Sequence, residues 1–155
     1  MITQVKKIMT AKVISVPIGT TLFEAHQLMN EKRIRHLPIT DKSDNVIGLL
    51  SQRDIQYVPD SKHITVELMM SSPVYCVEEN LPLRKVVFQM LEKKISSLLV
   101  INEDEDVVGI VTTDDLLWQL AHLLSDEKED RGLTLTAMEK QTIGEIANEL
   151  SNAGI

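Results

Sequence analysis

The chain has 155 residues, about the length of one domain, and a formal net charge of −7. Its 43% hydrophobic and 25% charged residues are typical of a folded, soluble domain and exclude a disordered or fibrous chain. The acidic charge and the 3% aromatic content disfavour nucleic acid as a partner, and no apolar run approaches the ~18 residues of a membrane span.

The N-terminus and the cysteine content predict a cytoplasmic protein. The opening residues, MITQVKKIMT, lack the apolar stretch of a secretion signal. Cys76 is the single cysteine, so it has no partner for an internal disulfide, and the seven methionines suit a reducing compartment.

An internal repeat covers most of the chain. Shifting the sequence by 61 positions places apolar, glycine and aspartate residues on equivalents of the same kind without a gap. The matched pairs include Val5 and Val66, Met9 and Met70, Gly48 and Gly109, and Asp54 and Asp115. We therefore divide the chain into a first repeat (residues 1–60), a second repeat (61–125) and a tail (126–155).

Each repeat predicts the same elements in chain order, which form an α+β unit of the type β-α-β-β-α. A short apolar strand at 13–16 and 74–77 precedes a helix that begins near Leu22 and Leu83, with Pro82 in its first turn. A hairpin follows, with strands at 37–40 and 46–50 and at 98–101 and 107–111. A second helix begins near Arg53 and Asp114. Because ~60 residues bury little surface alone, we expect the repeats to pack face to face through their sheets.

The tail predicts a charged linker and a C-terminal amphipathic helix. Residues 125–132 are mostly charged, and the spacing of Thr136 and Glu139 is that of a helix-capping box. The apolar face of the helix contains Ile143, Ile146, Ala147 and Leu150. Two roles stay open for this helix, which either packs on its own module or provides an interface for a second protomer or a target protein.

One motif occurs at the same place in both repeats, where the last strand meets the last helix. It contains Gly48, Ser51 and Asp54 in the first repeat, and the second repeat has the same pattern of glycine, hydroxyl and aspartate at residues 109–115. A hydroxyl and free backbone N–H groups at a helix N-terminus attract phosphate, and the carboxylate can accept two hydrogen bonds from a ribose diol. The alternative is a capping box in which hydroxyl and acid only stabilise the helix start. Both interpretations can hold together.

These features resemble a pair of cystathionine-β-synthase (CBS) domains, also called a Bateman module. The resemblance covers about residues 3–125 and rests on the two junctions and on the segments Ile8-Met9-Thr10, Met69-Met70-Ser71 and Arg35-His36-Leu37-Pro38-Ile39. It implies two β-α-β-β-α units packed about a pseudo-twofold axis. It also implies two clefts that commonly hold AMP, ADP, ATP, NAD or S-adenosylmethionine. Such modules usually regulate other proteins and often form disc-like homodimers.

The resemblance also implies roles for individual residues. Asp54 and Asp115 would bind the ribose hydroxyls in the two clefts, and Ser51 and Thr112 would approach the ribose or phosphate. The adenine and the cleft walls would involve Thr10, Ala11, Val13, His36, Pro38, Ser71, Ser72, Val74, Ser97 and Leu99.

The residue that precedes the aspartate differs between the repeats, with Arg53 in the first and Asp114 in the second. Arg53 can donate a forked pair of hydrogen bonds to phosphate, helped by Arg33, Arg35 and His36 if these face the same cleft. Adjacent carboxylates disfavour a polyphosphate in the second cleft unless the other repeat compensates. We therefore expect the first-repeat cleft to bind phosphate more tightly. Alternatively, the basic residues are an ordinary solvated helix end.

The sequence predicts no catalysis, no metal site and no cofactor other than a regulatory ligand. The four histidines show no metal-ligand spacing, Cys76 lies in a predicted strand as a packed thiol, and the side chains of Asp114 and Asp115 diverge by ~100° on a helix. We expect a homodimeric regulatory module that binds an adenosine-containing ligand and relays its occupancy to an unidentified protein target. The alternative is a structural or protein-interaction module with empty or vestigial clefts.

Overall fold

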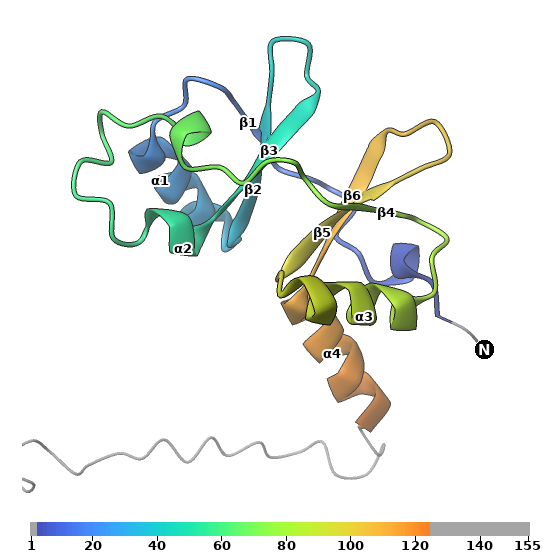
Figure 1. Cartoon of the computed structure of the whole chain (residues 1–155). Helices are drawn as coiled ribbons and strands as arrows, with labels where there is room; N and C mark the ends of the chain where they lie inside the picture. The colour runs from blue at the N-terminus through green and yellow to red at the C-terminus, as the bar shows by residue number, and fades with distance from the viewer. Residues whose placement is uncertain (1–2, 125–155) are drawn as a thin grey trace, which may run out of the picture. The chain divides into compact units, whose positions relative to one another are not determined.

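The computed structural model describes residues 3–124, and each repeat forms one three-stranded sheet with its helices (Figure 1). The first repeat contains η1 (Val5–Lys7), β1 (Val16–Pro17), α1 (Leu22–Lys32), β2 (His36–Thr40), β3 (Val46–Ser51) and α2 (Gln52–Ile55). The second contains η2 (Val66–Leu68), β4 (Cys76–Glu78), α3 (Leu83–Lys93), β5 (Ser97–Ile101), β6 (Val107–Thr112) and α4 (Thr113–Leu124). The predicted α+β repeats are confirmed. The linker and helix predicted for the tail lie outside the described residues.

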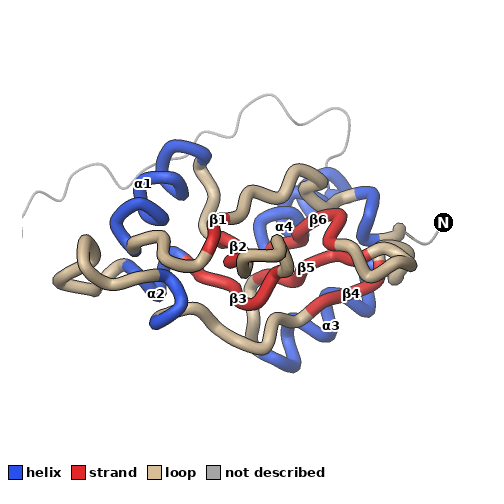
Figure 2. The backbone as a smooth tube through the Cα atoms, turned by 90° about the horizontal axis from the view of Figure 1, so that it is seen from above, coloured by secondary structure: helices blue, strands red, loops and turns tan. Residues whose placement is uncertain are grey.

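The two sheets have the same topology and the same register. In each, the first strand pairs in parallel with the second, which pairs antiparallel with the third, in the orders β1-β2-β3 and β4-β5-β6. Figure 2 shows the strands of both sheets gathered at the centre, with the helices mostly on the outside. Both repeats, up to Ala121, belong to one compact unit.

The long helix of each repeat ends in the same way but starts differently. Thr21 caps α1, since its backbone N–H donates to Glu24 Oε2 (2.8 Å) and its hydroxyl oxygen accepts from the Glu24 N–H (3.2 Å). Both helices end at a residue in the left-handed conformation, Arg33 (φ 54°) or Lys94 (φ 53°). The sequence pattern predicts Pro82 in the first turn of α3. In the structure, Pro82 is instead the N-cap that precedes this turn. The reason is its ψ of 132°, which keeps it extended while its carbonyl accepts the first helical bond.

The first strand of each repeat is shorter than predicted and shifted along the chain. Strand β1 has only two residues, Val16–Pro17, and β4 has three, Cys76–Glu78. The prediction of strands over 13–16 and 74–77 was therefore only partly correct. Val13 and Val74 line clefts instead of pairing in the sheets, which leaves the chain before each strand irregular.

The leading segment of each repeat packs on the core of the other repeat. Val5, in η1, is fully buried in the core of the second repeat, where its N–H donates to Leu81 O (3.0 Å). Val66, in η2, is fully buried in the core of the first repeat, where its N–H donates to Thr20 O (2.9 Å). The two repeats therefore exchange their leading segments: η1 completes the core of the second repeat, and η2 completes the core of the first.

The last helices differ in length and in burial. Helix α2 has four residues and buries Ile55, whereas the twelve residues of α4 include none that is buried. Within residues 3–124, no helix combines the length and apolar character needed to cross a membrane.

Candidate functional site

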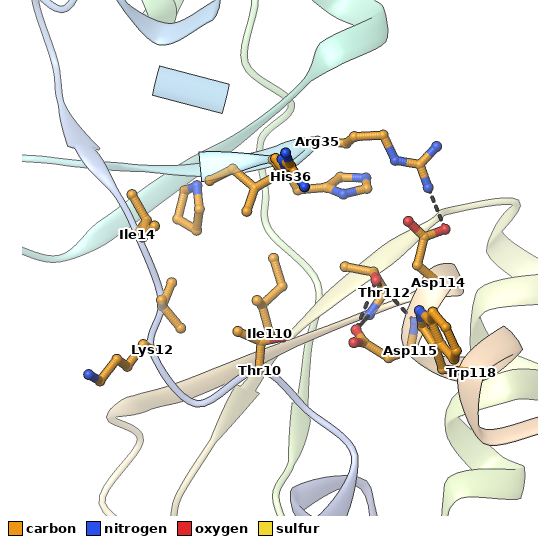
Figure 3. Close-up of a pocket in the computed structure, with 14 residues that line it drawn as sticks. Thr10, Lys12, Ile14, Arg35, His36, Ile110, Thr112, Asp114, Asp115 and Trp118 are labelled. Atoms are coloured by element: carbon orange, nitrogen blue, oxygen red, sulfur yellow. Dashed lines mark hydrogen bonds and ion pairs between the residues drawn. The ribbon is translucent and has the colours of Figure 1, made fainter. Parts of the chain in front are cut away.

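Two clefts lie where the repeats meet, and each contains the aspartate of one repeat and an entry segment of the other. We name them the Asp115 cleft and the Asp54 cleft. The Asp115 cleft has a volume of about 230 Å³ (Figure 3), and its lining residues are Thr10, Lys12, Val13, Ile14, Arg33, Ile34, Arg35, His36, Pro38, Ile110, Thr112, Asp114, Asp115 and Trp118. The Asp54 cleft has a volume of about 290 Å³ and is lined by His36, Leu49, Ser51, Arg53, Asp54, Ser71, Pro73, Val74, Tyr75, Lys94, Ile95, Ser96 and Ser97.

Most of the residues expected to form the clefts do line them. Six are in the Asp115 cleft, namely Thr10, Val13, His36, Pro38, Thr112 and Asp115. The Asp54 cleft contains Ser51, Arg53, Asp54, Ser71, Val74 and Ser97, and also His36. Neither lining includes Ala11, Ser72 or Leu99. Ala11 and Ser72 are exposed, whereas Leu99 is buried with its backbone N–H bonded to Tyr75 O.

The basic residues at the end of α1 face a different cleft from the one expected. Arg33 and Arg35 line the Asp115 cleft and do not line the Asp54 cleft. The cause is the exchange between repeats, because the start of β2 lies opposite the helix junction of the second repeat. These arginines were expected to support a phosphate beside Asp54 only if they faced the Asp54 cleft, and neither of them lines that cleft. Among the described residues that line the clefts, His36 alone is shared by both.

The repeated hydroxyl and aspartate form capping interactions in both junctions. Asp115 Oδ2 accepts from the Thr112 N–H (2.7 Å) and hydroxyl (2.8 Å), and the Asp115 N–H reaches Thr112 Oγ1 at 3.5 Å. Asp54 Oδ2 likewise accepts from the N–H and the hydroxyl of Ser51, both at 2.7 Å. All of these bonds use Oδ2, so within the described residues neither Oδ1 atom has a hydrogen bond. The capping box and an acceptor for a ligand hydroxyl thus coexist on one carboxylate.

Arg35 and Asp114 form an ion pair between the repeats. The guanidinium comes from the segment before β2, and the carboxylate comes from the first turn of α4 (Figure 3). Both side chains are about half exposed, at 53% and 55%. The first repeat therefore compensates one of the two adjacent carboxylates in the Asp115 cleft, as the sequence left open.

His36 links the two repeats between the clefts. Its Nε2 is 2.8 Å from Ser96 Oγ, which belongs to the second repeat. Burial lowers the pKa of His36 below its ordinary value, and the positive charges of Arg35 and Arg53 lower it further. His36 is therefore neutral at pH 7, with one ring nitrogen available as an acceptor.

Several cleft residues were not predicted from the sequence. Ile14, Ile110 and Trp118 line the Asp115 cleft, and Tyr75 and Lys94 line the Asp54 cleft. Trp118 follows Asp115 by three residues, which is one helical turn, so helical spacing was a usable signal for it. The other four residues are brought to the clefts by packing between repeats and leave no local signal.

Two further features of residues 3–124 concern metal binding and the cysteine. No group of three or more His, Cys, Asp or Glu side chains is placed to hold a metal ion. Cys76 is exposed and not packed, contrary to expectation, because it lies on the outward face of β4. Partial burial of the thiol itself still raises the pKa of Cys76, which disfavours the nucleophilic thiolate.

Comparison with protein families identifies this architecture. The model of the CBS domain matches the chain twice, over residues 5–59 and 64–122. The chain belongs to the CBS domain family. The two matches follow the two structural repeats, so the chain contains a CBS pair, as the sequence resemblance indicated.

Solved CBS pairs have the same fold. The CBS domain pair of protein MJ0100, in complex with 5′-methylthioadenosine and S-adenosyl-L-methionine, is 28% identical with a TM-score of 0.73, over 79% of this chain and 99% of that chain. A conserved CBS domain protein of unknown function from Thermoplasma acidophilum, TA0289, is 29% identical with a TM-score of 0.71, over 81% of this chain and 79% of that one.

Curated relatives include enzymes that contain a similar pair. A homoserine O-acetyltransferase of Methanohalobium evestigatum is 32% identical over 114 residues, which is 74% of this chain and 23% of the relative. The chain thus spans about a quarter of the length of such relatives.

Proposed function

We propose that this CBS pair is a non-catalytic regulatory module that binds an adenosine-containing ligand (AMP, ADP, ATP, NAD or S-adenosylmethionine) and relays its occupancy to a protein target. The observation that carries the proposal is the arrangement of the two aspartates. Each has one carboxylate oxygen held by the helix cap and a second oxygen that has no hydrogen bond within the described residues, in a cleft closed by the other repeat.

The walls of the Asp115 cleft suit a nucleoside. The lining includes Thr10 and an apolar wall formed by Ile14, Pro38 and Ile110. This wall can contact the flat faces of an adenine (Figure 3). Asp115 lies at the other side of this wall, so that a ribose attached to the base reaches its carboxylate. A carboxylate that accepts two hydrogen bonds from a diol distinguishes a ribose from a deoxyribose.

The composite clefts provide a physical basis for the relay. A ligand in either cleft touches both repeats, so it binds more tightly to the arrangement of repeats that best fits it. Occupancy therefore shifts the population of the module toward that arrangement, and a partner that prefers the same arrangement senses the ligand. Activities named for the relatives belong to longer proteins, of which the matched segment covers about a quarter, and enzymatic activity is not part of this proposal.

The proposal includes a homodimer in the cytoplasm. Helix α4 carries the exposed apolar residues Leu117 (62%) and Leu120 (49%), and α3 carries Phe88 (49%) and Leu91 (67%). Exposed apolar side chains on neighbouring turns are typical of protein interfaces. The same observation supports the alternative function, a protein-interaction module with vestigial clefts, and ligand titration separates the two.

The deciding experiment is a calorimetric titration of the full chain with AMP, ADP, ATP, NAD and S-adenosylmethionine at controlled magnesium. Saturable binding that weakens in Asp54→Asn or Asp115→Asn protein is the expected result. The stoichiometry then reports whether one or both clefts are occupied. No binding across the panel would contradict the regulatory proposal and favour the interaction module.

A further inference from the structure

The two clefts carry opposite charges at equivalent positions. Arg53 directly precedes Asp54, and Asp114, which is 61 residues further along, directly precedes Asp115. Both side chains line the cleft of their own aspartate. At this equivalent position, the Asp54 cleft therefore has a cation, Arg53, and the Asp115 cleft has an anion, Asp114.

The direction of a bound nucleoside decides which part of it meets this position. In the Asp115 cleft, the apolar wall formed by Ile14 and Ile110 lies on one side of Asp115, and Asp114 and Trp118 lie on the other (Figure 3). A base on the apolar wall with its ribose on Asp115 directs the 5′ substituent of the ribose toward Asp114. This substituent is a phosphate in a nucleotide and an uncharged or cationic group in other adenosyl compounds.

The surroundings of Asp114 oppose a phosphate at the 5′ position. The guanidinium of Arg35 is paired with Asp114, so a phosphate must compete with that carboxylate for the arginine. Of the other cations of this cleft, Lys12 lies on the far side from Asp114 (Figure 3), so it does not replace Arg35 beside that carboxylate. An amine or another cation at the 5′ position gains an ionic contact with the carboxylate of Asp114 instead.

The surroundings of Arg53 favour a phosphate. None of the ion pairs within the described residues involves Arg53 or Lys94, the two cations of the Asp54 cleft. Arg53 also lines an adjoining cavity of about 380 Å³ whose lining includes Arg35 and His36 and no carboxylate side chain. A phosphate on the 5′ carbon in this cleft therefore meets a guanidinium that forms no ion pair within the described residues. The carboxylate in this lining is that of Asp54, which the ribose would occupy.

We propose that the two clefts select adenosyl ligands of opposite 5′ charge: the Asp54 cleft takes a 5′-phosphorylated ligand, and the Asp115 cleft takes one with an uncharged or cationic 5′ substituent. Asp114, held by Arg35, is the residue that determines the second preference. The inference rests on the proposed function, since it requires that nucleosides bind at the two aspartates.

The test uses the full chain with one cleft disabled at a time and ligands that differ only at the 5′ carbon. In Asp54→Ala protein, which leaves the Asp115 cleft, adenosine and 5′-amino-5′-deoxyadenosine should bind at least about tenfold more tightly than AMP. Adding Asp114→Asn should raise the affinity for AMP about tenfold and weaken the amine. Arg35→Gln should act in the opposite direction, because Asp114 then loses its partner. In Asp115→Ala protein, which leaves the Asp54 cleft, AMP should bind more tightly than adenosine. Adding Arg53→Gln should remove that preference.

Matched controls separate a local effect from one of net charge or folding. Glu103→Gln removes one negative charge from an exposed loop that lines neither cleft, and it should leave the ratio of AMP to adenosine affinity unchanged. Circular dichroism melting confirms that each variant is folded. Equal ratios in the two clefts, or a ratio that Asp114→Asn does not change, would overturn the inference while the proposed function stands. Absence of binding by AMP, adenosine and 5′-amino-5′-deoxyadenosine to the unmodified chain would overturn the inference, and absence of binding across the wider panel named above would overturn the proposed function as well.

Discussion

The side chain of Met70 lies directly over Gly48, so that a Cβ atom at residue 48 would come within 2.7 Å of Met70 Cγ and nearer still to its Sδ. The same relationship recurs 61 residues away, where Met9 covers Gly109 and its Cγ would lie 2.9 Å from an added Cβ. Each methionine belongs to the leading segment of one repeat, and each glycine belongs to the last sheet strand of the other repeat. The glycines thus leave room for the exchanged segments.

Gly48→Ala should destabilise the protein by about 1–3 kcal/mol, because the added methyl group forces Met70 out of its position. Chemical denaturation measures the loss. The matched test is a double-mutant cycle with Met70→Ala, in which the space vacated by the methionine accepts the new methyl group. The free energy of unfolding of the double variant should exceed the value expected from adding the two single losses by at least about 0.5 kcal/mol. Additive effects would show that Met70 does not restrict residue 48.

Val5→Ala should weaken the second repeat although Val5 belongs to the leading segment of the first. Val5 is fully buried beside Val77 and Val86, and removing its methyl groups should cost about 2 kcal/mol. Hydrogen exchange should therefore become faster in β5 and β6. The matched variant Val66→Ala should instead speed exchange in β2 and β3. Faster exchange in the same repeat for both variants would contradict the exchange of leading segments.

The sequence predicts the order of elements because helical and strand periodicities are local and occur twice. It also predicts the positions of Asp54 and Asp115 at helix starts, since hydroxyl and acid at this spacing form a cap wherever the helix packs. It does not predict that Val5 packs in the core of the second repeat, because an apolar residue can pack equally well in either core. Strand β1 is shorter than its apolar run because Val13 contacts the cleft and not a neighbouring strand.

The composition of the clefts depends on tertiary structure for the same reason. The cluster around Arg35 is visible in the sequence, but its partner Asp114 lies 79 residues away in the other repeat. Repeats align equivalent positions, whereas the clefts join non-equivalent ones, such as Pro38 with Thr112. A symmetry argument from the sequence therefore finds most of the lining residues without assigning them to the correct cleft.

Asp115→Asn should lower the affinity of its cleft for an adenosyl ligand by about tenfold or more, because the amide loses the charged acceptor of the ribose hydroxyls. Asp54→Asn should do the same for the other cleft, and each variant should leave the second site intact. Isothermal titration of the full chain measures both. Asp104→Asn, in an exposed loop, is the control that should not change binding. Unchanged affinity in the Asp115 or Asp54 variant would remove the ribose assignment of that residue.

Leu120→Asp should shift a homodimer toward monomer if α4 forms the interface, because a buried carboxylate without a partner is strongly unfavourable. Light scattering after size-exclusion chromatography measures the mass at fixed concentration. Ser43→Asp adds the same charge to an exposed loop of the first repeat and should leave the mass unchanged. An unchanged dimer in the Leu120 variant would place the interface elsewhere.

The stability of the protein should depend on pH through His36. Burial first, then Arg35 and Arg53, lower the pKa of His36 in the folded state, while the unfolded chain keeps the ordinary value of 6.5. Below pH 6.5 the unfolded chain therefore binds more protons at this residue than the folded one, so the free energy of unfolding falls as the pH falls toward the folded-state pKa. The loss for one proton cannot exceed about 1.4 kcal/mol per pH unit.

Urea denaturation between about pH 5 and 7 measures this slope, and NMR of the ring protons reports the pKa of His36 directly. His36→Gln, which retains a polar group near the position of Nε2, should flatten the slope. Ser96→Ala should retain most of it, because burial is the main cause of the low pKa and the hydrogen bond to Ser96 is not among the causes. If His36→Gln left the slope unchanged, the pH dependence would arise from other groups and His36 would titrate as an exposed histidine does.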